Sequence, residues 1–175
     1  KAYTTRVGAG PFPTEMTGRL AEAIRARGNE YGATTGRPRR CGWFDAIVLR
    51  YAVRINGVDT VALTKLDVLD QCDTVKICTS YRYRGETLTE FPEEETVLAE
   101  AEPVYEEVSG WLAPTDGARN EADLPAKARQ YLDRLHELIG VPFCLISTGA
   151  VRHDTILCED SPLLSWVPSV RGSLF

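Results

Sequence analysis

The chain has 175 residues, enough for one domain that buries roughly 70% of the surface exposed by its unfolded form. Hydrophobic residues make up 43% and charged residues 26%, which is typical of a globular protein and argues against disorder. The net charge of −5 argues against a general nucleic-acid binder, because such proteins present a broad basic surface. No apolar run is long enough to span a membrane as a helix.

The five cysteines do not group with one another, or with His136 and His153, at the spacing of a metal site. An odd, scattered set in a chain without a secretory signal predicts reduced thiols and a cytoplasmic location. The first residues lack an initiator Met and have strand character, so we expect the chain to be part of a longer polypeptide. We see no linker or repeat and treat residues 1–175 as a single region.

The predicted elements begin with a strand over Lys1–Val7, followed by a loop rich in Gly and Pro. Residues Thr17–Arg27 are predicted to form the first helix. A second helix is predicted between Phe44 and Ile55, with Asp45 in its first turn, where the helix dipole favours a carboxylate. Its predicted apolar face, at helical spacing, comprises Phe44, Ile47, Val48, Tyr51, Ala52 and Ile55.

Two short apolar runs, Thr60–Thr64 and Val141–Ile146, each follow a predicted helix. Such runs are typical of strands that are buried on both faces of a parallel sheet. The helix before the second run is predicted over Pro125–Ile139, with Asp123 as its cap.

Between these helix-to-strand units we predict a strand over Lys76–Tyr81 and a hairpin arm over Tyr83–Leu88. The acidic stretch Glu93–Gly110 has no clear period, and we assign no structure to it. A last short strand is predicted over Thr155–Leu157. The alternation of helices and strands predicts the α/β class, with helices packed on a mainly parallel sheet.

The cluster Thr64-Lys65-Leu66-Asp67 follows the first buried strand, and ligands of open α/β sheets bind at the carboxyl ends of strands. Guanine presents two adjacent donors, its N1–H and its exocyclic amino group, and an ionised aspartate can accept both. Adenine lacks this pair, so Asp67 would select guanine, while the stem of Lys65 would lie along the base. The alternative is a lysine and an aspartate in a solvated turn.

Ser147-Thr148-Gly149 holds the same position after the second strand, where small residues let a ligand approach the backbone closely. The alternative there is an ordinary turn.

A basic loop, Thr34-Thr35-Gly36-Arg37-Pro38-Arg39-Arg40, predicts an anion site, because arginine binds carboxylates and phosphates through paired hydrogen bonds. The alternatives are a solvated loop and a nucleic-acid contact, and the lack of interleaved aromatic residues argues against the latter.

Several stretches share their residues and their order with one protein family. They are Thr5–Glu15, Gly28–Arg37 with Gly42-Trp43, Leu63–Asp70, Ile77-Cys78, Gly110-Trp111 and Ile146–Gly149. Together they resemble the adenylosuccinate synthetases over almost the whole chain. The resemblance implies part of a P-loop GTPase-like α/β fold and a magnesium-dependent ligase of purine nucleotide synthesis. Such a ligase joins L-aspartate to IMP at the expense of GTP, and the family is typically a homodimer.

The resemblance also gives each cluster a ligand. The aspartate-binding loop would comprise Ala33, Thr34, Thr35, Gly36, Arg37, Pro38 and Arg39. IMP would contact Val7 and Arg37, and GTP would contact Arg39, Lys65, Leu66, Asp67, Ser147, Thr148 and Gly149. The family's phosphate-binding loop, catalytic aspartate, catalytic histidine and expected Mg²⁺ ligands lie upstream of this chain. We therefore assign it no catalytic residue and no metal ligand, and expect it to be inactive alone. The alternative is a non-catalytic module that binds guanine nucleotide or a dicarboxylate.

Overall fold

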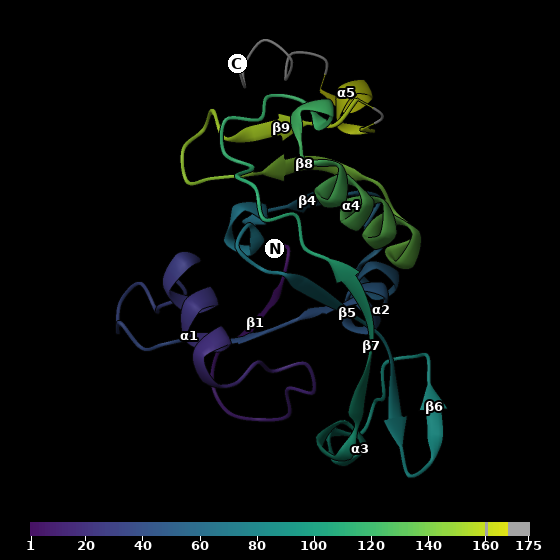
Figure 1. Ribbon diagram of the computed structural model, residues 1–175. Coiled ribbons are helices and arrows are strands. Elements are labelled where there is room, and N and C mark those ends of the chain that lie inside the picture. The colour runs from purple at the N-terminus through teal and green to yellow at the C-terminus, as the bar shows by residue number, and fades with distance from the viewer. Residues whose placement is uncertain (160, 168–175) are drawn as a thin grey trace. The chain divides into compact units, whose positions relative to one another are not determined.

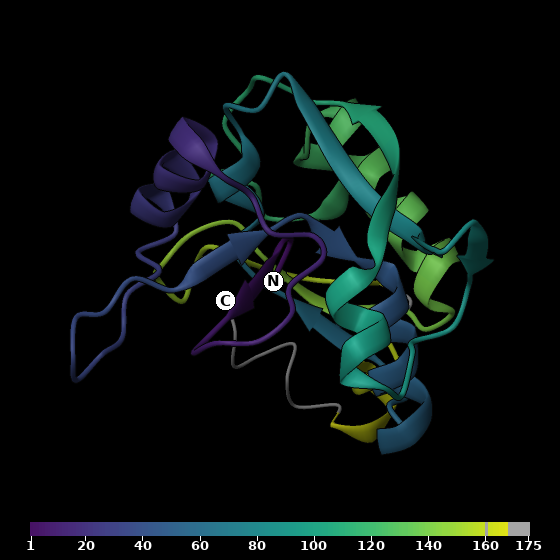
Figure 2. The ribbon, with the colours of Figure 1, turned by 90° about the horizontal axis from the view of Figure 1, so that it is seen from below.

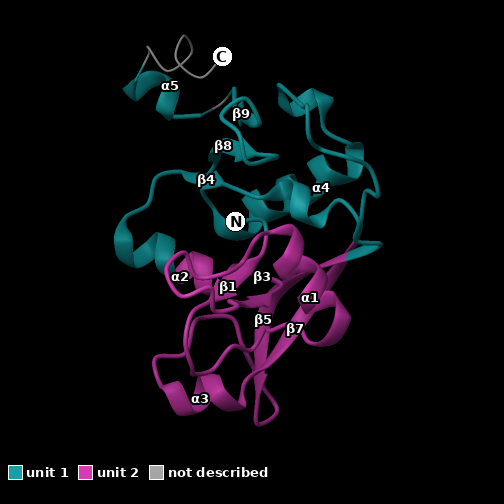
Figure 3. Ribbon diagram, turned by 90° about the vertical axis from the view of Figure 1, so that its left-hand side faces the viewer, with its two compact units in different colours: residues 1–2, 52–74, 109–175 teal, residues 3–51, 75–108 magenta. Residues whose placement is uncertain are grey.

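The computed structural model describes residues 1–159 and 161–167. The chain divides into two compact units, each assembled from segments that are separated in the sequence (Figure 3). Unit 1 comprises Lys1–Ala2, Ala52–Thr74 and Ser109–Phe175, and unit 2 comprises Tyr3–Tyr51 and Val75–Val108. Unit 1 contains the two polar clusters that follow the apolar runs, and unit 2 contains the basic loop.

Unit 1 is built on a three-stranded sheet in the order β4–β8–β9 (Figure 1). β4 (Val61–Leu63) runs parallel to β8 (Phe143–Ser147), and β9 (Thr155–Leu157) runs antiparallel to β8. The helix α4 (Ala126–Ile139) lies alongside this sheet (Figures 1 and 3). The predicted pairing of a helix with a following parallel strand is therefore confirmed here.

The apolar stripe predicted for α4 is buried, and the helix ends at the left-handed Gly140, whose φ is 76°. The prediction that Asp123 caps α4 is wrong. Asp123 instead closes a capping box with Asn120 on the short helix η2 (Glu121–Asp123). β4 is not buried on both faces either, because Ala62 is exposed on this edge strand. Another short helix of unit 1, α5, comprises Leu163–Trp166.

In unit 2, β1 (Thr4–Arg6) pairs antiparallel with β2 (Arg40–Gly42). The helix α1 (Gly18–Arg27) contacts β2, as Figure 1 also shows. The segment that joins α1 to β2 carries the basic loop. This arrangement places the loop and the residues that follow β1 in the same unit.

A second sheet of unit 2 is mixed and centres on β5 (Thr74–Tyr83). Its partners are β3 (Phe44–Asp45), which is parallel, β6 (Glu86–Leu88), which is antiparallel, and β7 (Glu102–Ser109). The hairpin between β5 and β6 confirms the prediction from Arg84-Gly85, where both residues have positive φ. The stretch to which we assigned no structure forms α3 (Glu95–Glu100) and β7.

The helix α2 (Ala46–Asn56) begins later than predicted, because the two residues before it form β3. Asp45 caps the helix: its Oδ1 accepts hydrogen bonds from the backbone N–H groups of Ile47 and Val48, at 3.1 and 3.2 Å. The predicted apolar face is only partly correct, since Val48 is 38% exposed and Ile55 is 59% exposed.

The α/β class is confirmed, and its sheets are mixed. Parallel pairing occurs between β3 and β5 and between β4 and β8, whereas β1–β2, β5–β6 and β8–β9 are antiparallel. In the described part of the chain, no helix combines the length and the apolar character needed to cross a membrane.

Candidate functional sites

The first site lies at the carboxyl ends of β4 and β8 in unit 1. In the parallel register Leu63 pairs with Ile146, so the two polar clusters that follow these residues begin at the same edge of the sheet. The carboxyl ends of adjacent parallel strands are where open α/β sheets bind ligands. The structure thus brings together the two clusters that the sequence predicted separately, and we call this place the strand-end site.

Lys65 and Asp67 do not continue the strand β4 as an extended segment. Lys65 has φ 63° and ψ 40°, a left-handed conformation that is uncommon for a residue with a side chain. Asp67 lies in the first turn of the helix η1 (Leu66–Leu69), which the fully buried Leu66 anchors. Such backbone strain persists only where surrounding packing fixes it, and it clusters at functional sites.

Asp67 has an unsatisfied oxygen. Its Oδ1 is buried and accepts no hydrogen bond from the described part of the chain. Burial raises the pKa of this carboxyl, and a hydrogen bond from its own backbone N–H acts against that rise. The nearby carboxylates of Asp70 and Asp154 raise the pKa further, and Lys65 lowers it. A buried acceptor without a donor costs free energy, so a ligand that donates to Asp67 would recover it.

The second cluster of this site is held by Asp154, which sequence reasoning did not single out. The backbone N–H and the hydroxyl of the buried Thr148 both donate to the Asp154 carbonyl, at 2.8 and 3.3 Å. Ser147 Oγ donates to the Gly149 carbonyl at 2.9 Å. A Cβ at position 149 would overlap the Asp154 carboxylate, so glycine is needed there. In the sequence, Asp154 is marked only by its position directly before the predicted strand Thr155–Leu157.

Asp70 has a structural role next to the strand-end site. Its carboxylate accepts hydrogen bonds from Trp111 Nε1 at 2.6 Å and from the Thr115 backbone N–H at 2.8 Å. These contacts tie the end of η1 to the segment around Trp111. Burial raises the pKa of Asp70, and the hydrogen bonds from Trp111 and Thr115 act against that rise.

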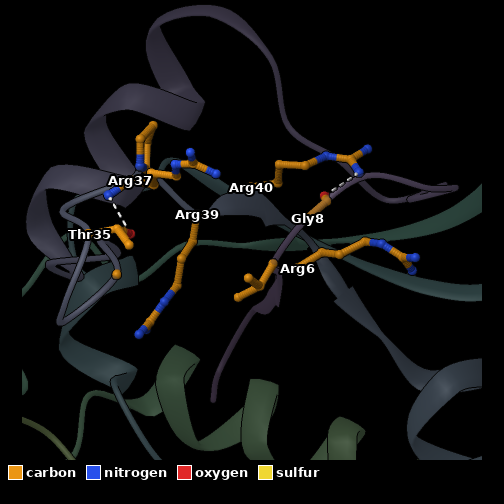
Figure 4. Close-up of a pocket in the computed structure, with 9 residues that line it drawn as sticks. Arg6, Gly8, Thr35, Arg37, Arg39 and Arg40 are labelled. Atoms are coloured by element: carbon orange, nitrogen blue, oxygen red, sulfur yellow. Dashed lines mark hydrogen bonds between the residues drawn. The ribbon is translucent and has the colours of Figure 1, made fainter.

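The second site is a pocket of about 570 Å³ in unit 2, which we call the arginine pocket (Figure 4). It is lined by Arg6, Val7, Gly8, Gly32, Thr35, Arg37, Pro38, Arg39 and Arg40. Five of these were predicted as ligand residues: Val7, Thr35, Arg37, Pro38 and Arg39. Three other predicted residues of the loop, Ala33, Thr34 and Gly36, do not line the pocket.

The loop of the arginine pocket is closed by its own backbone. Gly32 N–H donates to the Arg37 carbonyl and Gly36 N–H donates to the Gly32 carbonyl, each at 2.8 Å. Tyr31 and Pro38 form an antiparallel bridge at the base of the loop. Gly36 has φ 64°, a value that favours glycine. Figure 2 shows the loop, in dark blue, extending away from α1 and β2.

The arginines of the pocket differ in their partners. Arg40 makes two hydrogen bonds to Glu15, at 2.8 and 2.6 Å, and this contact is the main cause of the lowered pKa of Glu15. Arg39 donates to Glu30 at 2.9 Å. The guanidinium of Arg37 makes no hydrogen bond or ion pair within residues 1–159 and 161–167. Arg37 is therefore available to an anionic ligand.

Taken together, the fold and its two sites define an α/β protein that presents a buried acidic acceptor at strand ends and a basic pocket on a loop. The model of the adenylosuccinate synthetase family matches residues 1–156. The chain therefore belongs to the adenylosuccinate synthetase family.

Relatives from bacteria support this assignment. The chain is 56% identical over 156 residues to the adenylosuccinate synthetase of Heliobacterium modesticaldum, covering 89% of this chain and 36% of the relative. It is 57% identical over 160 residues to that of Pelotomaculum thermopropionicum, covering 91% of this chain and 38% of the relative. The chain thus spans little more than a third of the length of the curated relatives that it matches.

A solved structure also matches. The fully ligated adenylosuccinate synthetase of Plasmodium falciparum is similar with a TM-score of 0.86 and 39% sequence identity, over 89% of this chain and 38% of that one. Magnesium, which the family resemblance implies, finds no site among the described residues, where no three His, Cys, Asp or Glu side chains gather to hold a metal ion. We derive no step of the reaction through that ion.

Proposed function

We propose that this chain provides the guanine-recognition site and the aspartate- and IMP-binding loop of an adenylosuccinate synthetase. In that reaction, GTP transfers a phosphoryl group to the 6-oxygen of IMP, and the amine of L-aspartate then displaces phosphate to form adenylosuccinate. The observation that carries the proposal is the buried, unpaired Oδ1 of Asp67 beside the Ser147–Gly149 loop. Membership of the family and this vacant acceptor support the same ligand.

At the strand-end site, the proposed ligand is the base of GTP. The N1–H and the exocyclic amino group of guanine would donate to the Asp67 carboxylate and satisfy its unpaired oxygen. The backbone of Ser147–Gly149 would approach the base closely, which the glycine allows. Adenine would leave the carboxylate unpaired, so the site would reject ATP.

At the arginine pocket, the proposed ligands are L-aspartate and IMP, with GTP contacting Arg39. Arg37 supplies a guanidinium that has no competing acceptor among the described residues, and a carboxylate can bind it through two parallel hydrogen bonds. Thr35 and Gly32 line the same pocket and offer a hydroxyl and backbone groups. Val7 lies in the lining next to Arg6, in the position proposed for IMP.

Three broader features belong to the same proposal. We propose a homodimer, because the family is typically dimeric, and magnesium ligands supplied by residues outside those described here. We also propose a cytoplasmic location, which is supported by five buried cysteines that form no disulfide within the described residues.

The test is a chimera in which residues 1–156 replace the matching segment of the Heliobacterium modesticaldum synthetase. The parent enzyme is the control, and adenylosuccinate formation is measured with IMP, L-aspartate and GTP. We expect the chimera to be active within about tenfold of the parent, with GTP preferred strongly over ATP. A folded chimera that binds GTP or aspartate but forms no product would instead favour a non-catalytic binding module.

A further inference from the structure

Glu30 is a buried carboxylate that contacts Arg39, one of the residues that line the arginine pocket. Its side chain is 0% exposed, although it does not line the pocket itself. Oε1 accepts a hydrogen bond from the Tyr3 hydroxyl at 2.6 Å, and Oε2 accepts one from Arg39 NH1 at 2.9 Å. Burying a carboxylate is costly unless it is paired, so these contacts must be kept for the unit to fold as it does.

The backbone reinforces the same connection. Arg39 N–H donates to the Glu30 carbonyl at 2.9 Å, and Arg25 Nε donates to the Arg39 carbonyl at 3.0 Å. A Cβ at Gly28 would overlap the Tyr3 hydroxyl, so a side chain there would displace Tyr3 from Glu30. Arg39 is therefore fixed at its main chain and at one nitrogen of its side chain.

This anchoring leaves most of the Arg39 guanidinium free. A guanidinium has five N–H donors, and in the described part of the chain Arg39 gives only one contact, to Glu30. Its side chain is 31% exposed and lines the pocket. Arg40 differs, because its partner Glu15 is 32% exposed and takes both ends of the guanidinium.

From these contacts we infer that Glu30 is a positioning residue, which holds the plane of the Arg39 guanidinium so that its free donors face an anionic ligand. The inference rests on the proposed function, in which that ligand is GTP. Two parallel hydrogen bonds to a phosphate require a fixed guanidinium plane, and a side chain with several rotatable bonds reaches this state only if it is held. Glu30 acts through Arg39 and touches no ligand.

The test is Glu30→Gln in the chimera with the Heliobacterium modesticaldum enzyme. Glutamine keeps the size of the side chain and can still accept from Arg39, but it lacks the charge that fixes the pair. We expect the KM for GTP to rise about tenfold, while kcat and the KM for L-aspartate change less than about twofold. A fall in kcat together with a rise in the KM values for all three substrates would overturn the inference, because it would indicate a structural role only.

A double-mutant cycle shows whether Glu30 acts through Arg39. Arg39→Gln should raise the KM for GTP by itself, and adding Glu30→Gln should then change it by less than about twofold. Additive effects of the two substitutions would contradict the inference. If Glu30→Gln does not fold, Glu30→Asp replaces it in the cycle, because the shorter side chain keeps the charge but withdraws it from Arg39.

Chemical modification of the chain itself gives a readout that needs no catalysis. Phenylglyoxal reacts with accessible arginines, and mass spectrometry locates the modified residues. We expect Arg37 to react equally in the original and Glu30→Gln proteins, and Arg39 to react several-fold faster after the substitution. Equal rates at Arg39 would mean that Glu30 does not hold it. An unsubstituted chimera without synthetase activity would instead count against the proposed function, and this footprint would still report on the Glu30–Arg39 contact.

Discussion

The strand-end site and the arginine pocket differ in where their charge is buried. At the strand-end site the proposed ligand-binding group, Asp67, is itself partly buried and has an unpaired oxygen. In the arginine pocket the proposed ligand-binding group, Arg37, is exposed, and the buried charge is Glu30, at the base of the loop. The first site therefore carries an unsatisfied group before any ligand binds, whereas the second keeps its buried charge paired.

This difference has consequences for specificity and for stability. A buried acceptor on paired strands recognises the donor pattern of its ligand, and a ligand with the wrong pattern leaves it unsatisfied. An exposed arginine on a loop contributes charge and two parallel donors, and its contacts are more strongly screened by salt. Substitutions at the two sites should therefore change different properties of the protein.

The largest effect is expected from Asp67→Asn in the chimera. Asparagine offers one acceptor and one donor where guanine presents two donors, so the KM for GTP should rise by roughly 10- to 100-fold, consistent with the loss of a hydrogen bond to a charged group. Xanthosine triphosphate has a carbonyl in place of the amino group, so the variant should use it better than the original protein does. The measurement is kcat/KM for both nucleotides.

The matched control for this substitution is Asp73→Asn. Asp73 is exposed on the segment after η1, and its side chain makes no hydrogen bond within the described residues. We expect it to leave both nucleotides unaffected. If Asp67→Asn also left the KM for GTP unchanged, Asp67 would not belong to the nucleotide site, and the strand-end site would lose its proposed ligand.

A smaller but distinct effect is expected from Arg37→Leu. Because the Arg37 guanidinium has no partner in the described chain, its removal should leave the thermal midpoint within about 1 °C. The KM values for L-aspartate and IMP should rise about tenfold or more, since one charged, bidentate contact is lost. Thermal unfolding and initial-rate kinetics of the chimera measure the two quantities.

Arg19→Leu is the control for the loss of one positive charge. Arg19 is exposed on α1 and does not line the arginine pocket. It should change neither the thermal midpoint nor the substrate constants. A lowered midpoint for Arg37→Leu, with unchanged KM values, would mean that the loop is structural and that the pocket does not bind these substrates.

The two sites also differ in how far the sequence could predict them. The strand-end site was predictable because its determinants are local: each apolar run follows a helix with clear periodicity, and each run ends in a polar cluster. The parallel register of β4 and β8 then places the clusters together. What the sequence did not show was the local conformation, since Lys65 is left-handed and Asp67 lies in a helical turn.

The arginine pocket was predictable only in part, because its support comes from distant residues. Glu30 is 27 residues from Tyr3 and lies in the stretch Asn29-Glu30-Tyr31, which shows no period and no motif. Its burial is decided by packing that no local pattern encodes. The same reason explains why Asp154 was missed at the strand-end site. It also explains why β7 was not predicted, because β7 pairs with β5, which lies about thirty residues earlier in the chain.

The smallest expected effect concerns the stability of the chain without ligand, and it applies to the strand-end site only. Asp67 has one buried oxygen that accepts no hydrogen bond within the described residues, and a neutral amide costs less to bury than a carboxylate. Asp67→Asn should therefore stabilise the ligand-free chain by about 1 kcal/mol, or roughly 2–4 °C in the thermal midpoint. Gaining stability while losing GTP would mark Asp67 as a residue retained for binding.

The direction of the Asp67 pKa shift determines how this gain in stability changes with pH. The pKa of Asp67 is raised in the folded chain, so ionisation of this carboxyl disfavours folding wherever it is charged in both the folded and unfolded states. That penalty disappears as the pH falls through the folded-state pKa towards the unfolded value. The advantage of Asp67→Asn over the original chain should thus be largest above the folded-state pKa of Asp67 and shrink as the solution is acidified. Other carboxyls with shifted pKa values, such as Asp45 and Asp70, are common to both proteins and cancel in the difference. An advantage that instead grew on acidification would show that Asp67 is stabilised by its surroundings, and the strand-end site would then no longer differ from the arginine pocket in this respect.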